Sequence, residues 1–337
     1  MTASEFDLIT RHFTDGARAL PPRDDVLLGI GDDAALLAPP PGMAMAVSVD
    51  TLVAGVHFPE STDAAAIGHK ALAVNLSDLA AMGAEPAWLT LAITLPEQPP
   101  AAREAWLSGF ARGFFALASQ HRVQLVGGDT TRGPLSITVQ ITGFVPAQRA
   151  LRRAGARPGD AVLVTGSLGD AALGLRLLQG GVFPDPPAAE RQALVERLER
   201  PQPRLAAGLA LRGLASAAID LSDGLGADLG HILAASGVGA ELQVSRLPRS
   251  RAYVSLLGQD HWQLAANAGD DYELCFTVAA ADEQAARERL AALGLRCTRI
   301  GEISATPGLR WRDDAGRELA FAVAGYDHFG DSPRGQG

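Results

Sequence analysis

Aspartates at the ends of expected strands are the residues of this chain with the clearest capacity for chemistry. The stretch GIGDDAA (29–35) places Asp32 and Asp33 directly after a Gly-Ile-Gly turn. Turn chemistry alone accounts for such a pair, because Gly allows a positive φ and an Asp side chain accepts hydrogen bonds from nearby backbone. Binding of a cation is the alternative. The same position, at or just after an expected strand, is shared by Asp50, Asp129, Asp220, Asp223, Asp270 and Asp271, and a helix adds Asp78.

The carboxylate oxygens of these aspartates predict the binding of divalent cations. Each aspartate by itself is typical of an N-cap, a turn or a solvated loop. Together the carboxylates would repel one another unless cations offset their charge, and strand ends are where α/β folds bind ligands. Because no Cys or His set has metal-binding spacing, the donors favour Mg²⁺ over Zn²⁺, and several Mg²⁺ ions indicate polyphosphate chemistry.

The sequence lacks the common ATP-binding motifs. It contains neither GxxxxGK[ST] nor the HRD and DFG signatures of protein kinases, so any use of ATP requires a different fold. The nearest phosphate-loop candidate is TGSLGDAALG (165–174), which follows an expected strand and opens a helix but lacks the lysine. Packing of helix on strand is the interpretation that we favour for this stretch.

Composition indicates a soluble globular protein. A chain of 337 residues predicts two domains, and 47% apolar residues with 20% charged residues are ordinary values. A net charge of -9 and the lack of a Lys/Arg block argue against nucleic acid as a partner. No apolar run is long enough to cross a bilayer.

The N-terminus and the cysteines predict a cytoplasmic protein. The segment MTASEFDLITRHF is acidic where a signal peptide would be basic, and Ser4 with Asp7 is typical of a capping pair that opens a helix. Cys275 and Cys297 have no disulfide or metal-binding pattern, so we expect both in the core and the chain in a reducing compartment.

Mixed α and β elements must position the aspartates of the first half. Periodicity predicts strands over 44–50, 88–95 and 135–145, and helices over 66–82 and 102–121. In the first helix Leu72, Leu76 and Leu79 form an apolar row, so we expect Asp78 beside a buried face.

A change of composition near residue 148 marks an expected domain boundary, where PAQRALRRAGARPGD (146–160) is rich in Arg, Pro and Gly. We expect an N-terminal domain over 1–147, a C-terminal α/β domain over 148–330 and a disordered tail over 331–337. The second half predicts strands in AVLVT, AAIDLSDG and YELCFTV and closing strands, with helices over 224–236 and 282–293 and another that ends before 201.

Several long motifs in order resemble those of a known family. They are VDTLVAGVHF, HKALAVNLSDLAAMGAEPAW, LVGGDTTRGPLSITVQITGFVP, IDLSDGLGADLGHI, GDDYELCFTV and GYDHF. Together they resemble the thiamine-monophosphate kinase family of the aminoimidazole ribonucleotide synthetase superfamily. The resemblance spans residues 5–329.

The resemblance implies a mixed α/β, two-domain fold like that of aminoimidazole ribonucleotide synthetase. The N-terminal strands would form a barrel with those of a second copy in a homodimer, and the C-terminal α/β domain would pack against them. ATP as co-substrate, several Mg²⁺ ions and thiamine monophosphate would meet between the domains, and the product would be thiamine diphosphate.

The resemblance also implies roles for individual residues. Metal ligands would be Asp33, Ser48, Val49 through its backbone, Asp50, Asp78, Asp129, Asp220 and Asp223. Nucleotide contacts would be Gly128, Asp129, Arg153 and Ser222; thiamine contacts would be His57, Asp270 and Tyr326. Asp78, Asp129 and Arg153 would carry the catalytic step. Val49 stands where the family commonly has Thr, and Asp270 is one methylene shorter than the usual Glu.

The chemistry of a phosphate monoester as phosphoryl acceptor is compatible with the candidate site residues. The second pKa of a phosphate monoester is near 6, so its oxygen is already mostly anionic at neutral pH and needs no general base. The site must offset repulsion between two anions and align them, which predicts direct transfer with no phosphoenzyme.

Other interpretations stay open at this point. His57 can be a structural imidazole, Tyr326 can pack at a strand edge, and Arg153 can belong to a solvated linker. The rival functions are another ATP-using synthetase of the superfamily, such as aminoimidazole ribonucleotide synthetase, and a non-catalytic Mg-nucleotide-binding regulator.

Overall fold

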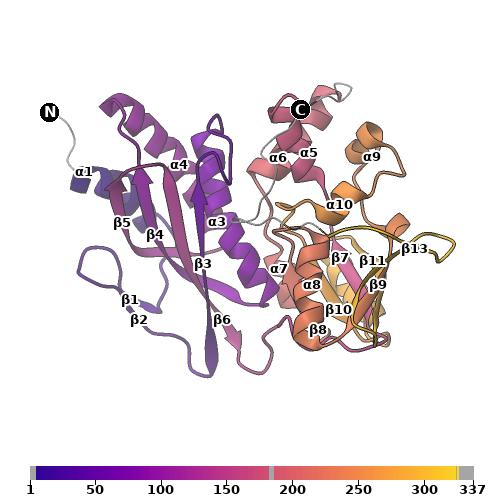
Figure 1. Ribbon diagram of the computed structural model, residues 1–337. Coiled ribbons are helices and arrows are strands. Elements are labelled where there is room, and N and C mark those ends of the chain that lie inside the picture. The colour runs from indigo at the N-terminus through magenta and orange to yellow at the C-terminus, as the bar shows by residue number, and fades with distance from the viewer. Residues whose placement is uncertain (1–4, 182–185, 324, 326–337) are drawn as a thin grey trace. The chain divides into compact units, whose positions relative to one another are not determined.

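The chain forms two compact units in the computed structural model, which describes residues 5–181, 186–323 and 325 (Figure 1). The first unit comprises Met1–Leu151 and Glu199–Gly213, and the second comprises Arg152–Leu198 and Leu214–Gly337. The segment Glu199–Gly213 belongs to the first unit because its helix α7 (Leu205–Leu211) packs on helix α3 (Ala64–Ala81). There Gly208 lets the backbones approach, since a Cβ atom at this position would lie 2.0 Å from the Ala80 carbonyl oxygen.

A four-stranded sheet organises the first unit. Its order is β3-β6-β4-β5, with β4 and β5 parallel and the other pairs antiparallel. The strands are β3 (Met43–Val53), β4 (Glu85–Leu95), β5 (Gln124–Arg132) and β6 (Ser136–Pro146). The strands expected at 44–50, 88–95 and 135–145 are confirmed, and strands β3 and β5 are the two edges.

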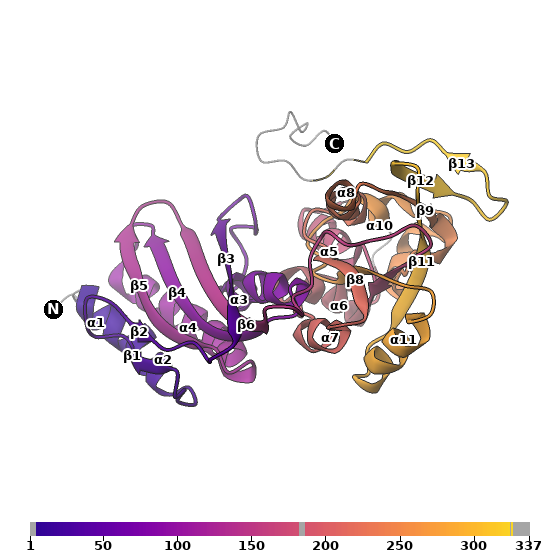
Figure 2. The same ribbon diagram turned by 90° about the horizontal axis from the view of Figure 1, so that it is seen from below.

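Two long helices cover one face of this sheet, as Figure 2 shows. Helix α3 packs against the strands, and α4 (Pro100–Gln120) packs along α3. The Asp63 carboxylate caps α3 by accepting hydrogen bonds from the Ala65 and Ala66 amides. Leu72, Leu76 and Leu79 are at most 1% exposed, which confirms the predicted apolar row.

The opposite face of the sheet is only partly covered. A short hairpin of β1 (Val26–Leu28) and β2 (Leu36–Leu37) packs there against Trp88 and Phe144, whose rings meet edge to face at 4.9 Å. Farther along strand β3, the side chains of Val47 and Val49 are 60% and 59% exposed. The N-terminal segment is helical, as expected, through α1 (Glu5–Ile9), η1 (Thr10–Thr14) and α2 (Asp15–Arg18); Ser4 lies outside the described residues.

A seven-stranded sheet organises the second unit, in the order β13-β12-β9-β11-β7-β10-β8. Its strands are β7 (Ala161–Thr165), β8 (Ala215–Asp220), β9 (Gly239–Gln243), β10 (Leu274–Val278), β11 (Cys297–Ser304), β12 (Gly308–Arg312) and β13 (Glu318–Leu319). Its helices are α5 (Asp170–Leu178), α6 (Ala188–Glu199), α8 (Leu225–Ser236), η2 (Val244–Arg246), α9 (Arg251–Leu257), α10 (Gln263–Asn267) and α11 (Glu283–Ala292).

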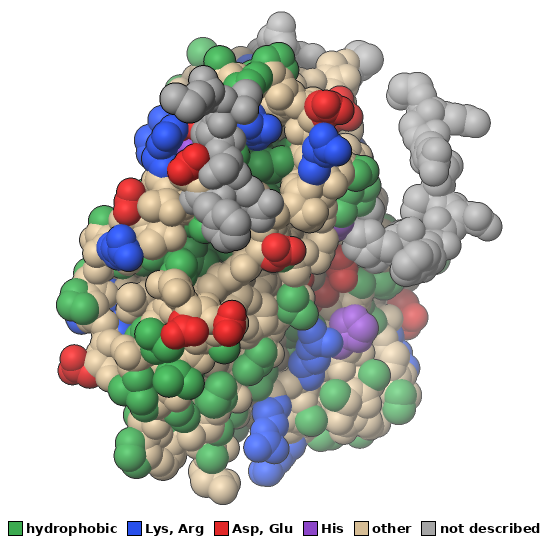
Figure 3. Space-filling view, turned by 90° about the vertical axis from the view of Figure 1, so that its left-hand side faces the viewer, with side chains coloured by type: hydrophobic (Ala, Val, Ile, Leu, Met, Phe, Trp, Pro, Cys, Tyr) green, Lys and Arg blue, Asp and Glu red, His purple; other side chains and the backbone are tan. Residues whose placement is uncertain are grey.

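The central strands β7 and β10 are fully buried, which is why they read as continuous apolar runs. Cys275 and Cys297 are free and buried, as expected. No helix among the described residues is long and apolar enough to cross a membrane. On the face shown in Figure 3, basic side chains are scattered among acidic and apolar ones and form no continuous stripe.

The contact between α3 and α4 depends on glycine, and this yields a stability prediction. A Cβ atom on Gly113 would lie 1.9 Å from the Ala65 carbonyl oxygen, so we expect Gly113→Ala to lower the free energy of unfolding by about 1–3 kcal/mol. Gly230 lies in helix α8 with no neighbouring atom within 4 Å, so Gly230→Ala should raise it by about 0.5–1 kcal/mol. Urea unfolding of both variants measures the effects; equal effects of the two substitutions would contradict the close packing.

Candidate functional site

A short hydrogen bond joins two of the predicted metal ligands in the first unit. The Ser48 hydroxyl on strand β3 donates to the Asp78 carboxylate on helix α3, with an oxygen to oxygen distance of 2.5 Å. Asp50 lies two residues farther along the strand and therefore projects from the same face as Ser48. Asp78 is half-buried beside the apolar row of its helix, as expected. The strand-to-helix packing therefore brings Ser48 and Asp78 together, and the metal-binding role of these residues stays a prediction.

The GIGDDAA turn separates the roles of its two aspartates. Gly31 has a φ of +131°, and the Asp32 carboxylate accepts a hydrogen bond of 2.8 Å from the Asp33 amide. Asp32 therefore shapes the turn, whereas the Asp33 side chain is exposed. This division matches the turn chemistry expected for Asp32 and leaves Asp33 accessible for a ligand.

Asp129 stands apart from Asp50 within one chain. The expectation that both residues end or follow strands is wrong, because strand β5 continues to Arg132 and strand β3 to Val53, so that Asp129 and Asp50 lie inside them. These strands are the opposite edges of the sheet. Three steps between neighbouring strands put them about 14 Å apart across the sheet. Asp129 and the adjacent Gly128 line a cavity of about 70 Å³ beside Ile30 and Leu91.

His57 is held by backbone contacts in the turn that follows strand β3. Its Nδ1 accepts a hydrogen bond of 3.0 Å from the Val53 amide, so this ring nitrogen carries no proton in that contact. The His57 carbonyl accepts a hydrogen bond of 3.2 Å from Lys70, whose side chain is 2% exposed on α3. These contacts fix the ring in place and are compatible with either a structural or a substrate-binding role.

Carboxylates crowd together where strand β8 meets helix α8 in the second unit. Asp220 ends β8, and Asp223 follows it in the loop. The Asp228 carboxylate, 3% exposed, accepts hydrogen bonds of 3.0 Å from the Asp223 and Gly224 amides. Burial first, and then the negative charges of Asp220 and Asp223, raise the pKa of Asp228 to about 7. The loop therefore concentrates negative charge in a place with little water.

The segments of the LSD and DDYE motifs run side by side. The Asp270 amide donates to the Ser222 carbonyl and the Tyr272 amide to the Leu221 carbonyl, both at 2.9 Å. This pairing brings together Ser222, a predicted nucleotide contact, and Asp270, a predicted thiamine contact. The Tyr272 hydroxyl donates to the Asp270 carboxylate at 3.1 Å. Asp270 and Tyr272 have φ values of +66° and +49°, which are unusual for residues other than glycine.

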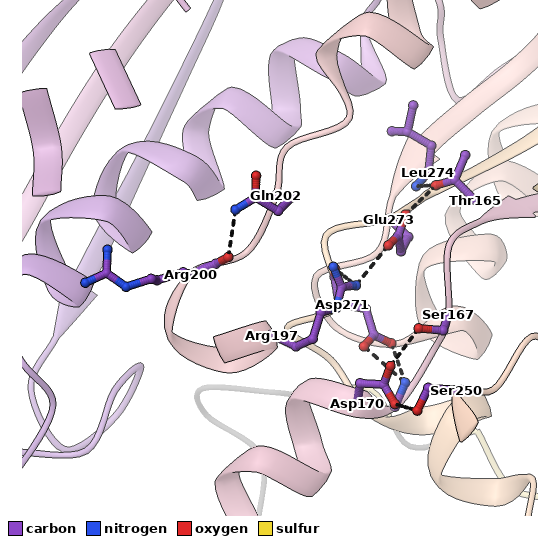
Figure 4. A network of polar contacts seen from close by, with 11 residues as sticks. Thr165, Ser167, Asp170, Arg197, Arg200, Gln202, Ser250, Asp271, Glu273 and Leu274 are labelled. Atoms are coloured by element: carbon purple, nitrogen blue, oxygen red, sulfur yellow. Dashed lines mark hydrogen bonds and ion pairs between the residues drawn. The ribbon is translucent and has the colours of Figure 1, made fainter. Parts of the chain in front are cut away.

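Two residues of the DDYE motif, Asp271 and Glu273, belong to a buried polar network (Figure 4). Glu273 forms an ion pair of 2.9 Å with Arg197 and accepts a hydrogen bond of 2.6 Å from Thr165. Both oxygens of the Asp271 carboxylate accept from the Gly169 amide, at 3.0 and 2.8 Å. Burial raises the pKa of Asp271 well above its usual value. These contacts assign the glycine-rich loop 165–170 a structural role, in agreement with the packing interpretation of TGSLGDAALG.

Sequence reasoning did not identify every residue of the site. Asp228 was missed, although an acidic residue in the first turn of a helix is a recognisable signal. Arg197 was missed because it precedes the DDYE motif by more than 70 residues. Arg153 is exposed in the loop before β7, and Tyr326 lies outside the described residues. Within 5–181, 186–323 and 325, no three Asp, Glu, His or Cys side chains are grouped closely enough to hold a metal ion.

Known proteins match the chain over nearly its whole length. Residues 31–145 match the model of the AIR synthase related protein N-terminal domain, and residues 157–314 match that of the C-terminal domain. The thiamine-monophosphate kinase of Salmonella typhimurium is 50% identical over 331 residues, covering 98% of this chain and 99% of that protein.

Solved structures of the same family also match the chain over most of its length. The crystal structure of the thiamine-monophosphate kinase from Stenotrophomonas maltophilia is 50% identical, with a TM-score of 0.83, and covers 92% of this chain and 97% of that one. The structure of AaThiL complexed with AMPPCP and TMP is 30% identical, with a TM-score of 0.74, and covers 96% of this chain and 97% of that one.

The crowded loop predicts a pH dependence of stability in metal-free protein. The pKa of Asp228 rises from 3.8 to about 7 on folding. The folded protein thus keeps a proton that the unfolded chain releases, so the stabilisation is complete below about pH 3.8 and is lost as the pH rises towards 7. Asp228→Asn removes this titration while its amide oxygen can still accept from the two backbone amides. In EDTA, the urea midpoint of the variant relative to the unaltered protein should therefore increase between pH 4.5 and pH 8; a difference independent of pH would contradict the assignment.

Proposed function

The chain belongs to the thiamine-monophosphate kinase family of the AIR synthase related proteins, and we infer that it uses ATP to phosphorylate thiamine monophosphate to thiamine diphosphate. Identity of 50% over nearly the whole of both chains carries this inference. The relative in complex with AMPPCP, an ATP analogue, and TMP supports the same pair of substrates. The two free, buried cysteines support the proposal that the reaction takes place in the cytoplasm.

The donor atoms of this chain fit Mg²⁺. The predicted ligands offer carboxylate, hydroxyl and carbonyl oxygens. The pKa of Asp228 is raised by burial and then by the negative charges of Asp220 and Asp223, and a divalent cation would offset those charges. We propose that the ions are held by Asp33, Ser48, the Val49 carbonyl, Asp50, Asp78, Asp129, Asp220 and Asp223. Bound Mg²⁺ would offset the charge of the phosphoryl group during transfer.

The residues of the chain then bind and align the two anions. Arg153 offers a guanidinium group for the phosphates of ATP, and Gly128 and Ser222 contact the nucleotide. His57, Asp270 and Tyr326 hold the thiamine part, so that the anionic phosphate oxygen of thiamine monophosphate faces the γ-phosphorus in line. Asp78 and Asp129 act as metal ligands in this step, and no side chain forms a covalent intermediate.

Separation of Asp50 and Asp129 supports a homodimer. The two residues lie on opposite edge strands about 14 Å apart, and the exposed Val47 and Val49 of β3 provide an apolar surface for a second copy. We propose that the sheets of two copies join into a barrel, in which Asp129 of one copy lies near Asp50 of the other. Each site is then completed only in the dimer.

Product analysis tests the function directly. Pure protein incubated with ATP, Mg²⁺ and thiamine monophosphate should convert the monophosphate to thiamine diphosphate, which chromatography resolves. ATP binding without formation of the diphosphate would overturn the kinase assignment and favour a non-catalytic regulator.

The two adjacent aspartates of the GIGDDAA turn should differ in their effect on catalysis. Asp33→Asn removes the negative charge of a proposed metal ligand and should lower kcat/KM at limiting Mg²⁺ by about a hundredfold. Asp32→Asn keeps an oxygen that can accept from the Asp33 amide and should lower it less than about threefold. Steady-state kinetics of both variants provide the comparison, and an Asp32→Asn defect as large as that of Asp33→Asn would contradict the division of roles.

Mixed dimers test whether Asp50 and Asp129 act across copies. Asp50→Asn and Asp129→Asn homodimers should both be inactive. A dimer with one copy of each variant contains one site with both residues intact, so it should recover roughly half of the unaltered activity. Two different affinity tags allow its purification. An inactive mixed dimer would show that both residues act within one chain.

A further inference from the structure

Two unusual backbone conformations hold the segment that carries Asp270. Asp270 and Tyr272 both have φ in the left-handed region, which residues other than glycine adopt only where the surroundings enforce it. Two backbone hydrogen bonds to Leu221 and Ser222 fix one side of this segment. Those two bonds do not involve the carbonyl of the intervening residue, Asp271. This carbonyl accepts a hydrogen bond from a side chain of helix α6 instead.

Arg197 of helix α6 reaches this segment from far along the chain. One of its terminal nitrogens donates to the Asp271 carbonyl at 3.2 Å and to the Glu273 carboxylate at 2.9 Å. The other oxygen of Glu273 accepts from Thr165, whose hydroxyl oxygen in turn accepts from the Leu274 amide at 2.9 Å. Because Glu273 is 0% exposed, the guanidinium has a fixed partner on β10 and cannot swing away from the segment without leaving a buried carboxylate unpaired.

We propose that Arg197 is a positioning residue for recognition of thiamine monophosphate. By binding the Asp271 carbonyl and the Glu273 carboxylate together, it holds Asp270–Tyr272 in the conformation in which Asp270 faces the thiamine part. This inference rests on the proposed function, because the role of Asp270 is part of that proposal. Arg197 itself makes no contact with substrate in this account.

The planar guanidinium suits this task better than an ammonium group would. It presents several N–H donors in a rigid arrangement and stays charged at all relevant pH values. Lysine is a shorter side chain with a compact charge, so it can neutralise Glu273 but holds the Asp271 carbonyl less firmly. Arg197→Lys therefore separates the positioning of the segment from neutralisation of the buried carboxylate.

Kinetics of Arg197→Met and Arg197→Lys test the proposal. Loss of a hydrogen bond to a charged group predicts about a tenfold rise in KM for thiamine monophosphate in Arg197→Met, with KM for ATP changed less than about twofold. Arg197→Lys should show a smaller rise, of about threefold, at unchanged thermal stability. Arg191→Met is the matched control, because Arg191 lies on the same helix and, among the described residues, its side chain donates a hydrogen bond to the Leu177 carbonyl. Both KM values of this variant should stay at those of the unaltered protein.

The outcomes distinguish the two proposals. If the unaltered protein forms no thiamine diphosphate, the proposed function fails, whatever the variants do. If it does form the diphosphate, KM for thiamine monophosphate that is unchanged in both Arg197 variants overturns the positioning role, and so does an equal rise of both KM values. Should Arg197→Met fail to fold, the Arg197→Lys result decides alone: a selective rise supports the role and no rise overturns it.

Discussion

Repulsion between carboxylates is the constraint on which the rest of the site depends. Asp220, Asp223 and Asp228 lie near one another at the junction of β8 and α8, where burial and then the charges of the two neighbours raise the pKa of Asp228 to about 7. The protein tolerates this only because backbone amides of the loop donate to Asp228. Such a loop costs stability in the absence of cations and gains it when cations bind, which suits a protein that handles anionic phosphates.

The DDYE motif shows how one short stretch combines two kinds of residue. Asp271 and Glu273 are buried in hydrogen bonds and an ion pair, so they stabilise the fold. Asp270 between Ser222 and Tyr272 is only partly buried and remains the residue proposed to bind substrate. Neighbouring acids in a sequence therefore have different environments, as do Asp32 and Asp33 in the first unit.

Local patterns predicted most of the fold, because apolar periodicity reflects the face that each element buries. The strands β3, β4 and β6 and the row of Leu72, Leu76 and Leu79 follow directly from it. Packing between distant segments could not be predicted in this way. The return of Glu199–Gly213 to the first unit depends on close contact at Gly208, and the link from Arg197 to Glu273 depends on the fold as a whole. The separation of Asp50 from Asp129 follows from strand order, which periodicity does not encode.

The response of stability to Mg²⁺ tests the central claim most directly, because it needs neither substrate nor substitution. If the crowded carboxylates bind divalent cations, adding Mg²⁺ to EDTA-treated protein should raise the urea midpoint. It should do so more at pH 8 than at pH 4.5, because Asp228 is protonated at pH 4.5 and then adds no negative charge beside Asp220 and Asp223. A midpoint that Mg²⁺ leaves unchanged at pH 8 would contradict the account.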